Sequence, residues 1–284
     1  MVSRIGVVGC GLMGSGIAEV AARSGFEVLV SETSPEAAEA GRARIEASLA
    51  RAVRSGKLDE AVVKDVFGRV HFTTGLAEMA DRQIVVEAVP EIEEAKLAVF
   101  AALDEVVEDA EAILATNTSS IPVMKLAMAT RRPAQVVGIH FFNPVPVLHL
   151  VELVTSLLTS EETGARAEQF ARDLGKQVIH SKDRAGFIVN ALLIPYLLSA
   201  IRMMESGFAS PEEIDLGMVE GCAHPMGPLA LADLIGLDTT MAVAQSLYQE
   251  FKEQLYAPPP LLLRMVEAGL LGRKAGRGFY QYQR

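Results

Sequence analysis

The chain has 284 residues, of which 50% are hydrophobic and 22% are charged, and its formal net charge is −10. This composition is typical of a globular protein with about two domains. The acidic balance argues against nucleic-acid binding, since a basic surface is needed to displace counterions from phosphates. The two cysteines are too few for a disulfide framework.

The first residues, MVSRIGVVG, lead directly into an apolar strand and lack the pattern of a secretory signal peptide. The longest uncharged run, 185–201, includes Asn190 and Pro195 and is too short for a membrane span. We therefore expect a cytoplasmic protein that does not insert into membranes.

The first part of the chain alternates short apolar runs with longer amphipathic stretches. The apolar runs predict strands at 4–8, 27–30, 70–72, 84–87, 113–116 and 136–139. The amphipathic stretches predict helices at 12–24, 35–55, 93–108 and 122–129. This order is typical of the α/β class and predicts a doubly wound, parallel, Rossmann-type sheet over residues 1–184.

The rest of the chain has no strand pattern, and we expect a smaller all-helical C-terminal domain over residues 185–284. An apolar helix is expected at 186–206, and Ser210 followed by Pro211 marks the start of the next one. Further helices are expected after Pro228 and after the prolines at 258–260. These apolar helices exceed what one small domain can bury, so we expect a two-fold homodimer through them.

A glycine-rich loop, Gly9-x-Gly11-x-x-Gly14, separates the first strand from the first helix. The three glycines would permit a tight turn, a close approach of the backbone to a pyrophosphate, and close packing of the helix on the strand. The second strand ends at Glu32, whose carboxylate could bind an adenosine ribose and would repel a 2′-phosphate. Residues 31–36 contain no arginine. The pattern predicts NAD rather than NADP, and a glycine turn without a ligand is the alternative.

Two ionisable residues, His140 and Glu152, lie in the otherwise almost wholly apolar stretch GIHFFNPVPVLHLVELV. Burying either group without a partner is costly. His140 follows an apolar strand, so we expect it at the carboxyl end of the sheet, where such sheets bind ligands. A turn at Pro144 and Pro146 could bring the two side chains together. An imidazole oriented by a carboxylate can take a proton from an alcohol that loses a hydride to NAD. A contact that only fixes the turn is the alternative.

A series of motifs follows along nearly the whole chain: GVVGCGLMGSGIAE, VVEAVPE, ATNTSSI, GIHFFNPVP, LVELV, GFIVN, HPMGPLALADLIGLD and GRKAGRGFY. Together they resemble the short-chain L-3-hydroxyacyl-CoA dehydrogenase family, and most closely its bacterial 3-hydroxybutyryl-CoA dehydrogenases. The resemblance implies NAD-dependent oxidation of a (3S)-3-hydroxyacyl-CoA to the 3-ketoacyl-CoA, and the reverse reduction.

The resemblance also implies four catalytic residues. His140 would be the general base, with Glu152 as its partner. Ser119 would hydrogen-bond the substrate hydroxyl, and Asn190 would hold the substrate oxygens. The amide of Asn190 lies in an apolar helix and needs a partner, for which an interhelix hydrogen bond is the alternative to a ligand.

Contacts to the cofactor NAD are implied in the same way. They would be made by Gly9, Gly11, Leu12, Met13, Gly14, Glu32, Glu91, Lys96, Asn117, Ser119, Asn143 and Lys274. Lys96 and Lys274 could equally be ordinary surface lysines. No metal site is expected.

A basic stretch at 41–57 interrupts the acidic chain, and arginine and lysine suit the phosphates of coenzyme A. The resemblance favours Ser48 and Lys57 as direct contacts to the acyl-CoA substrate. A solvated basic face is the alternative. The arginines that would share one side of a helix are Arg44, Arg51 and Arg54.

Three other functions fit parts of the sequence. The nearest is the same chemistry on an acyl-carrier-protein thioester. A hydroxyisobutyrate-type dehydrogenase would use a catalytic lysine in the helical domain, where this chain has Asn190. A non-catalytic NADH sensor would bind NADH without turnover and would be expected to carry a DNA- or partner-binding extension.

Overall fold

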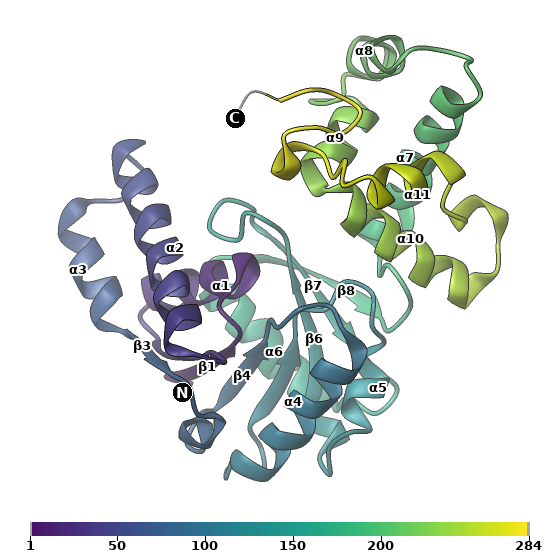
Figure 1. Ribbon diagram of the computed structural model, residues 1–284. Coiled ribbons are helices and arrows are strands. Elements are labelled where there is room, and N and C mark those ends of the chain that lie inside the picture. Colours follow the sequence, from purple (N-terminus) through teal and green to yellow (C-terminus); the bar gives the residue numbers. More distant parts are fainter. Residues whose placement is uncertain (1, 283–284) are drawn as a thin grey trace. The chain divides into compact units, whose positions relative to one another are not determined.

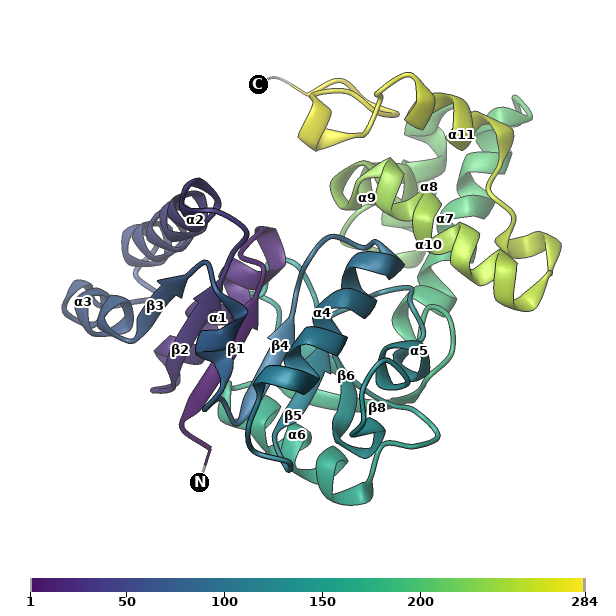
Figure 2. The same cartoon turned by 60° about the horizontal axis from the view of Figure 1, so that its bottom comes forward.

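The structure is a computed structural model of the chain and describes residues 2–282 (Figure 1, Figure 2). Its contacts divide the chain into two compact units, residues 1–184 and 185–284. The first unit is built on a β-sheet and the second from helices. Within the described residues, none of the helices has the length and apolar character that a membrane crossing requires.

One eight-stranded sheet forms the centre of the first unit, in the order β3-β2-β1-β4-β5-β6-β7-β8. β7 (Leu150–Thr155) is antiparallel to β6 and parallel to its other neighbour, β8 (Gln177–Lys182). The order reverses between β1 and β4, and open α/β sheets bind ligands at such a position. The six mutually parallel strands are β1 (Arg4–Val8), β2 (Glu27–Ser31), β3 (Val70–Thr73), β4 (Ile84–Glu87), β5 (Ile113–Thr116) and β6 (Val136–Phe141).

Helices cover both faces of this sheet (Figure 1, Figure 2). α1 (Leu12–Arg23) and α6 (Glu161–Asp173) share one hydrophobic cluster with alternate residues of the strands. α4 (Glu93–Val106) and α5 (Val123–Ala127) lie on the opposite face. α2 (Pro35–Arg54) and α3 (Glu60–Gly68) pack beside β3. Strands that are covered on both sides are mostly apolar, as β1 and β4 to β6 are, and their polar residues stand at or near the strand ends.

The second unit packs its helices around a core of leucine, isoleucine and alanine side chains. A capping box of Ser210 and Glu213 begins α8, with Pro211 in its first turn. Buried Asp233 accepts the N–H groups of Phe279 and Tyr280 and thereby fixes the C-terminal segment to α9. The helices are α7 (Val189–Glu205), α8 (Pro211–Cys222), α9 (Pro228–Ile235), α10 (Leu237–Phe251) and α11 (Pro260–Glu267).

The structure confirms the Rossmann-type class followed by helices, but the sheet is not wholly parallel. The pattern missed β8 and the helices α3 and α6, and it did not assign β7 as a strand. The chain leaves β6 through a short turn, 142–149, and only an antiparallel partner can be reached by such a connection. Predicted and observed ends of the other strands and helices differ by a few residues.

Candidate active site

The glycine loop joins β1 to α1. Gly9 has a φ of +88°, and a Cβ there would lie 2.8 Å from the Ala88 carbonyl oxygen. A Cβ on Gly14 would lie 1.8 Å from the Gly9 carbonyl oxygen. A Cβ on Gly11 would meet no protein atom within 4 Å. The turn and the helix packing therefore require Gly9 and Gly14, whereas the surface at Gly11 is open.

The start of α1 fits an anionic ligand. Its N-cap, Gly11, provides no side-chain cap, and no acidic residue lies in the first turn. The N–H groups at Leu12 and Met13 therefore have no partner within the helix, and the helix dipole is positive at this end. Such an arrangement binds the phosphates of a dinucleotide.

Glu32 follows β2 and lies beside the glycine loop. Its carboxylate accepts the N–H of Cys10 and, at 3.2 Å, that of Thr33. The Cys10 carbonyl oxygen accepts the Arg44 guanidinium at 3.2 Å, so this arginine contacts the glycine loop and does not extend a free basic face. Burial and the charge of Glu32 raise the pKa of the Cys10 thiol to about 12, against an opposing effect of Arg44.

The predicted histidine–carboxylate pair is formed across two antiparallel strands. His140 of β6 lies directly opposite Glu152 of β7, and side chains of opposite residues share one face of a sheet. The distance from His140 Nδ1 to Glu152 Oε2 is 2.7 Å. The two residues are 6% and 0% exposed. An ionised carboxylate only accepts hydrogen bonds, so opposite an ionised Glu152 we expect the neutral ring to carry its proton on Nδ1 and to have Nε2 as its basic nitrogen.

The turn between β6 and β7 is held by a buried lysine that the sequence analysis missed. Lys176 Nζ donates to the carbonyl oxygens of Val145 and Leu148 at 2.6 and 2.8 Å. Val145 also packs against α1, where a Cβ on Gly16 would lie 2.8 Å from the Cβ of Val145. Asn143 is exposed in this turn. The glycine-loop helix and the His140 turn are therefore packed together.

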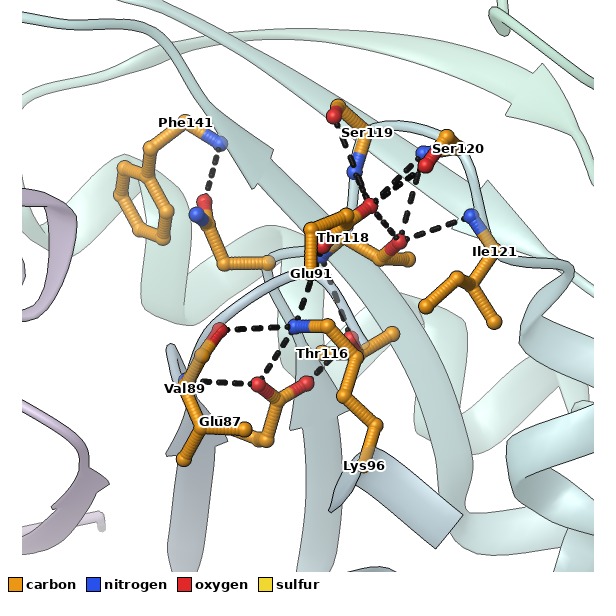
Figure 3. Close-up of polar contacts among 11 residues, drawn as sticks. Glu87, Val89, Glu91, Lys96, Thr116, Thr118, Ser119, Ser120, Ile121 and Phe141 are labelled. Atoms are coloured by element: carbon orange, nitrogen blue, oxygen red, sulfur yellow. Dashed lines mark hydrogen bonds and ion pairs between the residues drawn. The ribbon is translucent and has the colours of Figure 1, made fainter. Parts of the chain in front are cut away.

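The loop after β5 lies next to the loop after β4 (Figure 3). Glu91 accepts the N–H groups of Ser119 and Ser120 at 2.9 and 3.0 Å. Asn117 Oδ1 accepts the N–H of Phe141 at 2.9 Å. Three predicted site residues are thus part of one hydrogen-bonded region that reaches the strand end with the histidine.

Lys96 is buried, so its interpretation as a surface lysine is wrong. Its ammonium group lies 2.6 Å from a Glu87 oxygen and 3.2 Å from a Glu91 oxygen, and it donates to the Val89 carbonyl at 3.3 Å. Burial by itself would raise the pKa of Glu91, but Lys96 and hydrogen bonds from the loop after β5 lower it overall. Glu87 is a further site residue that was not predicted, although a carboxylate that ends a fully buried strand signals a buried cation.

The remaining predicted residues lie away from this region or in the second unit. Ser48 is half-buried on α2, and Lys57 is exposed in the turn after that helix. Asn190 is half-buried in the first turn of α7, so it lies in an apolar helix as expected. Lys274 is about half exposed and forms an ion pair with Asp238 at 2.6 Å. Their contacts to ligands stay predictions.

Two family models match the chain. The 3-hydroxyacyl-CoA dehydrogenase NAD binding domain matches residues 4–184, and the 3-hydroxyacyl-CoA dehydrogenase C-terminal domain matches residues 186–282. The chain therefore belongs to the 3-hydroxyacyl-CoA dehydrogenase family, whose members are NAD-dependent oxidoreductases. The sequence-based assignments of the family, the enzyme class and NAD are confirmed.

Close relatives cover the whole chain. The 3-hydroxybutyryl-CoA dehydrogenase of Mycobacterium tuberculosis is 59% identical over 282 residues, 99% of each chain. The crystal structure of FadB2 from the same species is 59% identical, with a TM-score of 0.98 over 99% of each chain. That of (S)-3-hydroxybutyryl-CoA dehydrogenase PaaH1 from Ralstonia eutropha is 44% identical, with a TM-score of 0.95 over the full length of both.

Proposed function

We propose that this protein oxidises (3S)-3-hydroxybutyryl-CoA to acetoacetyl-CoA with NAD and catalyses the reverse reduction. The observation that carries the proposal is the buried His140–Glu152 pair, at the same edge of the sheet as the glycine loop. The relatives named above act, by their names, on the four-carbon coenzyme A thioester. NAD and acyl-CoA thioesters are intracellular metabolites, so the proposal places the enzyme in the cytoplasm.

NAD, when bound, supplies the hydride acceptor. The N–H groups at Leu12 and Met13 would hold its phosphates, and Glu32 would accept the hydroxyl groups of its adenosine ribose. The Glu32 carboxylate already accepts the Cys10 N–H, which keeps it beside the loop. The same negative charge disfavours the 2′-phosphate of NADP.

His140 would transfer the proton. In the oxidation, Nε2 takes the proton of the substrate hydroxyl while the carbon that bears this hydroxyl loses its hydride. Nδ1 keeps its hydrogen bond to Glu152, whose negative charge stabilises the imidazolium. In the reduction, the imidazolium returns the proton to the ketone oxygen. Ser119 would orient the reacting oxygen, and Asn190 and the other predicted contacts would hold the thioester.

An NADH absorbance assay with the purified protein tests the proposal. We expect the highest kcat/KM with acetoacetyl-CoA and lower values with longer 3-ketoacyl-CoA chains. A higher value with the acyl-carrier-protein thioester would favour the carrier-protein alternative. Binding of NADH without turnover of any 3-ketoacyl thioester would contradict a catalytic function.

We also propose that the protein forms a homodimer through its second unit. Leu192 and Met203 are exposed on α7, and Phe208, just after this helix, is 79% exposed. Large apolar side chains that gather on one surface mark sites that bind other proteins, whereas a single exposed leucine does not. The double variant Leu192→Glu/Phe208→Glu should sediment as a monomer, whereas the wild type sediments as a dimer. The matched control Leu157→Glu replaces an exposed leucine of the first unit and should remain dimeric; a monomeric wild type would contradict the proposal.

A further inference from the structure

The turn between β6 and β7, residues 142–149, is anchored by a buried ammonium group. Lys176, the residue before β8, is 8% exposed. Its Nζ donates to the Val145 carbonyl oxygen at 2.6 Å and to the Leu148 carbonyl oxygen at 2.8 Å. Both of these partners are uncharged, whereas lysines are almost never buried in proteins unless an acid pairs with them. Stability alone therefore does not explain why a lysine occupies this position.

The charges around this ammonium group do not relieve its burial. Burial and the positive charge of Arg23 lower the pKa of Lys176, against an opposing effect of Glu19. Glu19 forms its own ion pair with Arg23, at 3.3 Å. Burying a charge without a close partner of opposite sign costs free energy. The contacts that Lys176 makes instead fix two carbonyl groups of one turn.

The turn itself is closely held. The Pro144 carbonyl oxygen accepts the N–H groups of Val147 and Leu148, both at 2.9 Å. Val145 is 1% exposed and packs on α1 at Gly16, where a Cβ would lie 2.8 Å from the Cβ of Val145. These contacts, together with the lysine, give the turn a single placement relative to the end of β6.

The turn begins beside the imidazole of the proposed general base. Phe142, its first residue, follows His140 by two positions, and residues two apart lie on the same side of an extended strand. The centroids of the two rings are 4.6 Å apart, and their planes are inclined at 56°. The hydrogen bond between Nδ1 and Glu152 fixes one atom of the imidazole but leaves the ring able to tilt about that contact. The neighbouring aromatic ring restricts this tilt and so fixes the direction of Nε2.

We infer that Lys176 is a positioning residue that anchors the turn 142–149 and thereby holds the Phe142 ring against the imidazole of His140. The inference deepens the proposed function and rests on it. Lys176 acts through the backbone of the turn and through Phe142. A misplacement of about 1 Å can cost about 100-fold in rate, so the direction of Nε2 decides how fast the substrate hydroxyl can lose its proton.

Two variants break this connection at different places. Lys176→Met keeps an unbranched apolar side chain of similar length but removes both hydrogen bonds to the turn. Phe142→Leu removes the ring contact and leaves the anchor in place, and it still tests the ring contact if Lys176→Met does not fold. The matched control is Lys182→Met, at an exposed lysine of β8. Cooperative thermal unfolding shows which variants fold.

Four quantities are measured on each full-length variant. They are hydrogen exchange of the two amides that donate to Pro144, the ¹H NMR shifts of the His140 ring, kcat with acetoacetyl-CoA, and the Kd of NADH. In the wild type the ring current of Phe142 displaces the His140 signals. For Lys176→Met we expect faster exchange, loss of most of that displacement, a kcat lower by about 10- to 100-fold, and a Kd within about threefold of wild type. Phe142→Leu should lose the displacement and about tenfold in kcat, with exchange and Kd as in the wild type. Lys182→Met should match the wild type in all four.

The outcomes separate this positioning role from its competitors. Unchanged exchange or unchanged His140 ring shifts in Lys176→Met would overturn the inference. A weaker affinity for NADH with kcat unchanged would show that the turn serves the cofactor through Asn143, and would overturn it as well. An unchanged kcat in Phe142→Leu would reduce the ring contact to packing, with the same consequence. A wild type that turns over no 3-ketoacyl-CoA would contradict the proposed function only, because exchange and ring shifts need no turnover and still decide whether Lys176 holds the ring.

Discussion

The two parts of the sheet position polar groups in different ways. Along the parallel strands β1 to β5, the polar groups come from the last strand residues, such as Glu87, and from the loops and helix starts that follow, and many of them are backbone N–H groups. In the antiparallel pair β6 and β7, they are side chains within the strands, and the ladder places His140 opposite Glu152. Strand register by itself places the side chains of the antiparallel pair. The loops of the parallel part are instead held in place by hydrogen bonds to side chains such as Glu91. The difference suggests that the antiparallel pair supplies the proton-transfer group and the parallel loops hold ligands.

The largest expected effect follows a change in the antiparallel pair. His140→Gln removes the proposed general base and should lower kcat by about 10²- to 10⁴-fold. The Kd of NADH should stay nearly unchanged, because the glycine loop and Glu32 belong to the other part of the sheet. His180→Gln is the control, since His180 is an exposed histidine of β8. Steady-state kinetics and fluorescence titration measure both quantities, and an unaltered kcat would remove the mechanism.

A smaller effect is expected when only the charge of the partner is removed. Glu152→Gln keeps a hydrogen-bond acceptor opposite the ring but no longer stabilises the imidazolium, so kcat should fall by about 10- to 100-fold. Glu162→Gln, at an exposed acid near the start of α6, should have wild-type kinetics. Full activity of Glu152→Gln would mean that the pair only fixes the turn.

The parallel part is tested by two glycines of one loop. Gly11→Ala adds a Cβ that meets no protein atom, so the melting temperature should not change, while the Kd of NADH should rise about tenfold because the methyl group occupies the approach to the pyrophosphate. Gly14→Ala drives a Cβ into the Gly9 carbonyl oxygen and should destabilise the fold strongly. Unchanged NADH affinity in a stable Gly11→Ala would show that no dinucleotide lies at this loop.

The smallest effect concerns the two thiols. Because burial and Glu32 raise the pKa of Cys10 to about 12, only about one thiol in 10⁴ is ionised at pH 8, and the fraction grows only as the pH approaches that value. Cys222 is exposed. Alkylation with iodoacetamide, followed by mass spectrometry of the folded protein, should modify Cys222 and leave Cys10 intact. Equal rates would contradict the described burial of Cys10.

The sequence predicts the central strands because each is mostly apolar, and it predicts the His140–Glu152 pair because two ionisable groups stand out in an apolar stretch. It does not reveal β8, an edge strand whose side chains are mostly exposed or half-exposed. The prolines at 144 and 146 predict a turn that brings Glu152 back toward His140, but the direction of β7 depends on the length of that turn. The register that places His140 opposite Glu152 is known only once the two strands have paired.

The buried ion pair of Lys96 and Glu87 is a feature that the sequence pattern did not predict. Lys96 follows Glu93 and Glu94 on an amphipathic helix, a context that is typical of a solvated lysine. Its burial arises because the loop after β4 turns the chain so that the first turn of the helix returns to Glu87, only nine residues earlier in the sequence. A short separation in sequence therefore does not predict an ion pair unless the path of the loop between the strand and the helix is known.

The central claim is that Glu152 orients the His140 ring for proton transfer. ¹⁵N NMR of the imidazole nitrogens, with His140 assigned by comparison with His140→Gln, tests it most directly. Above the pH at which the ring becomes neutral, the proton should reside on Nδ1 and leave Nε2 unprotonated, the reverse of the form that free histidine prefers. A neutral His140 that carries its proton on Nε2 would contradict the account.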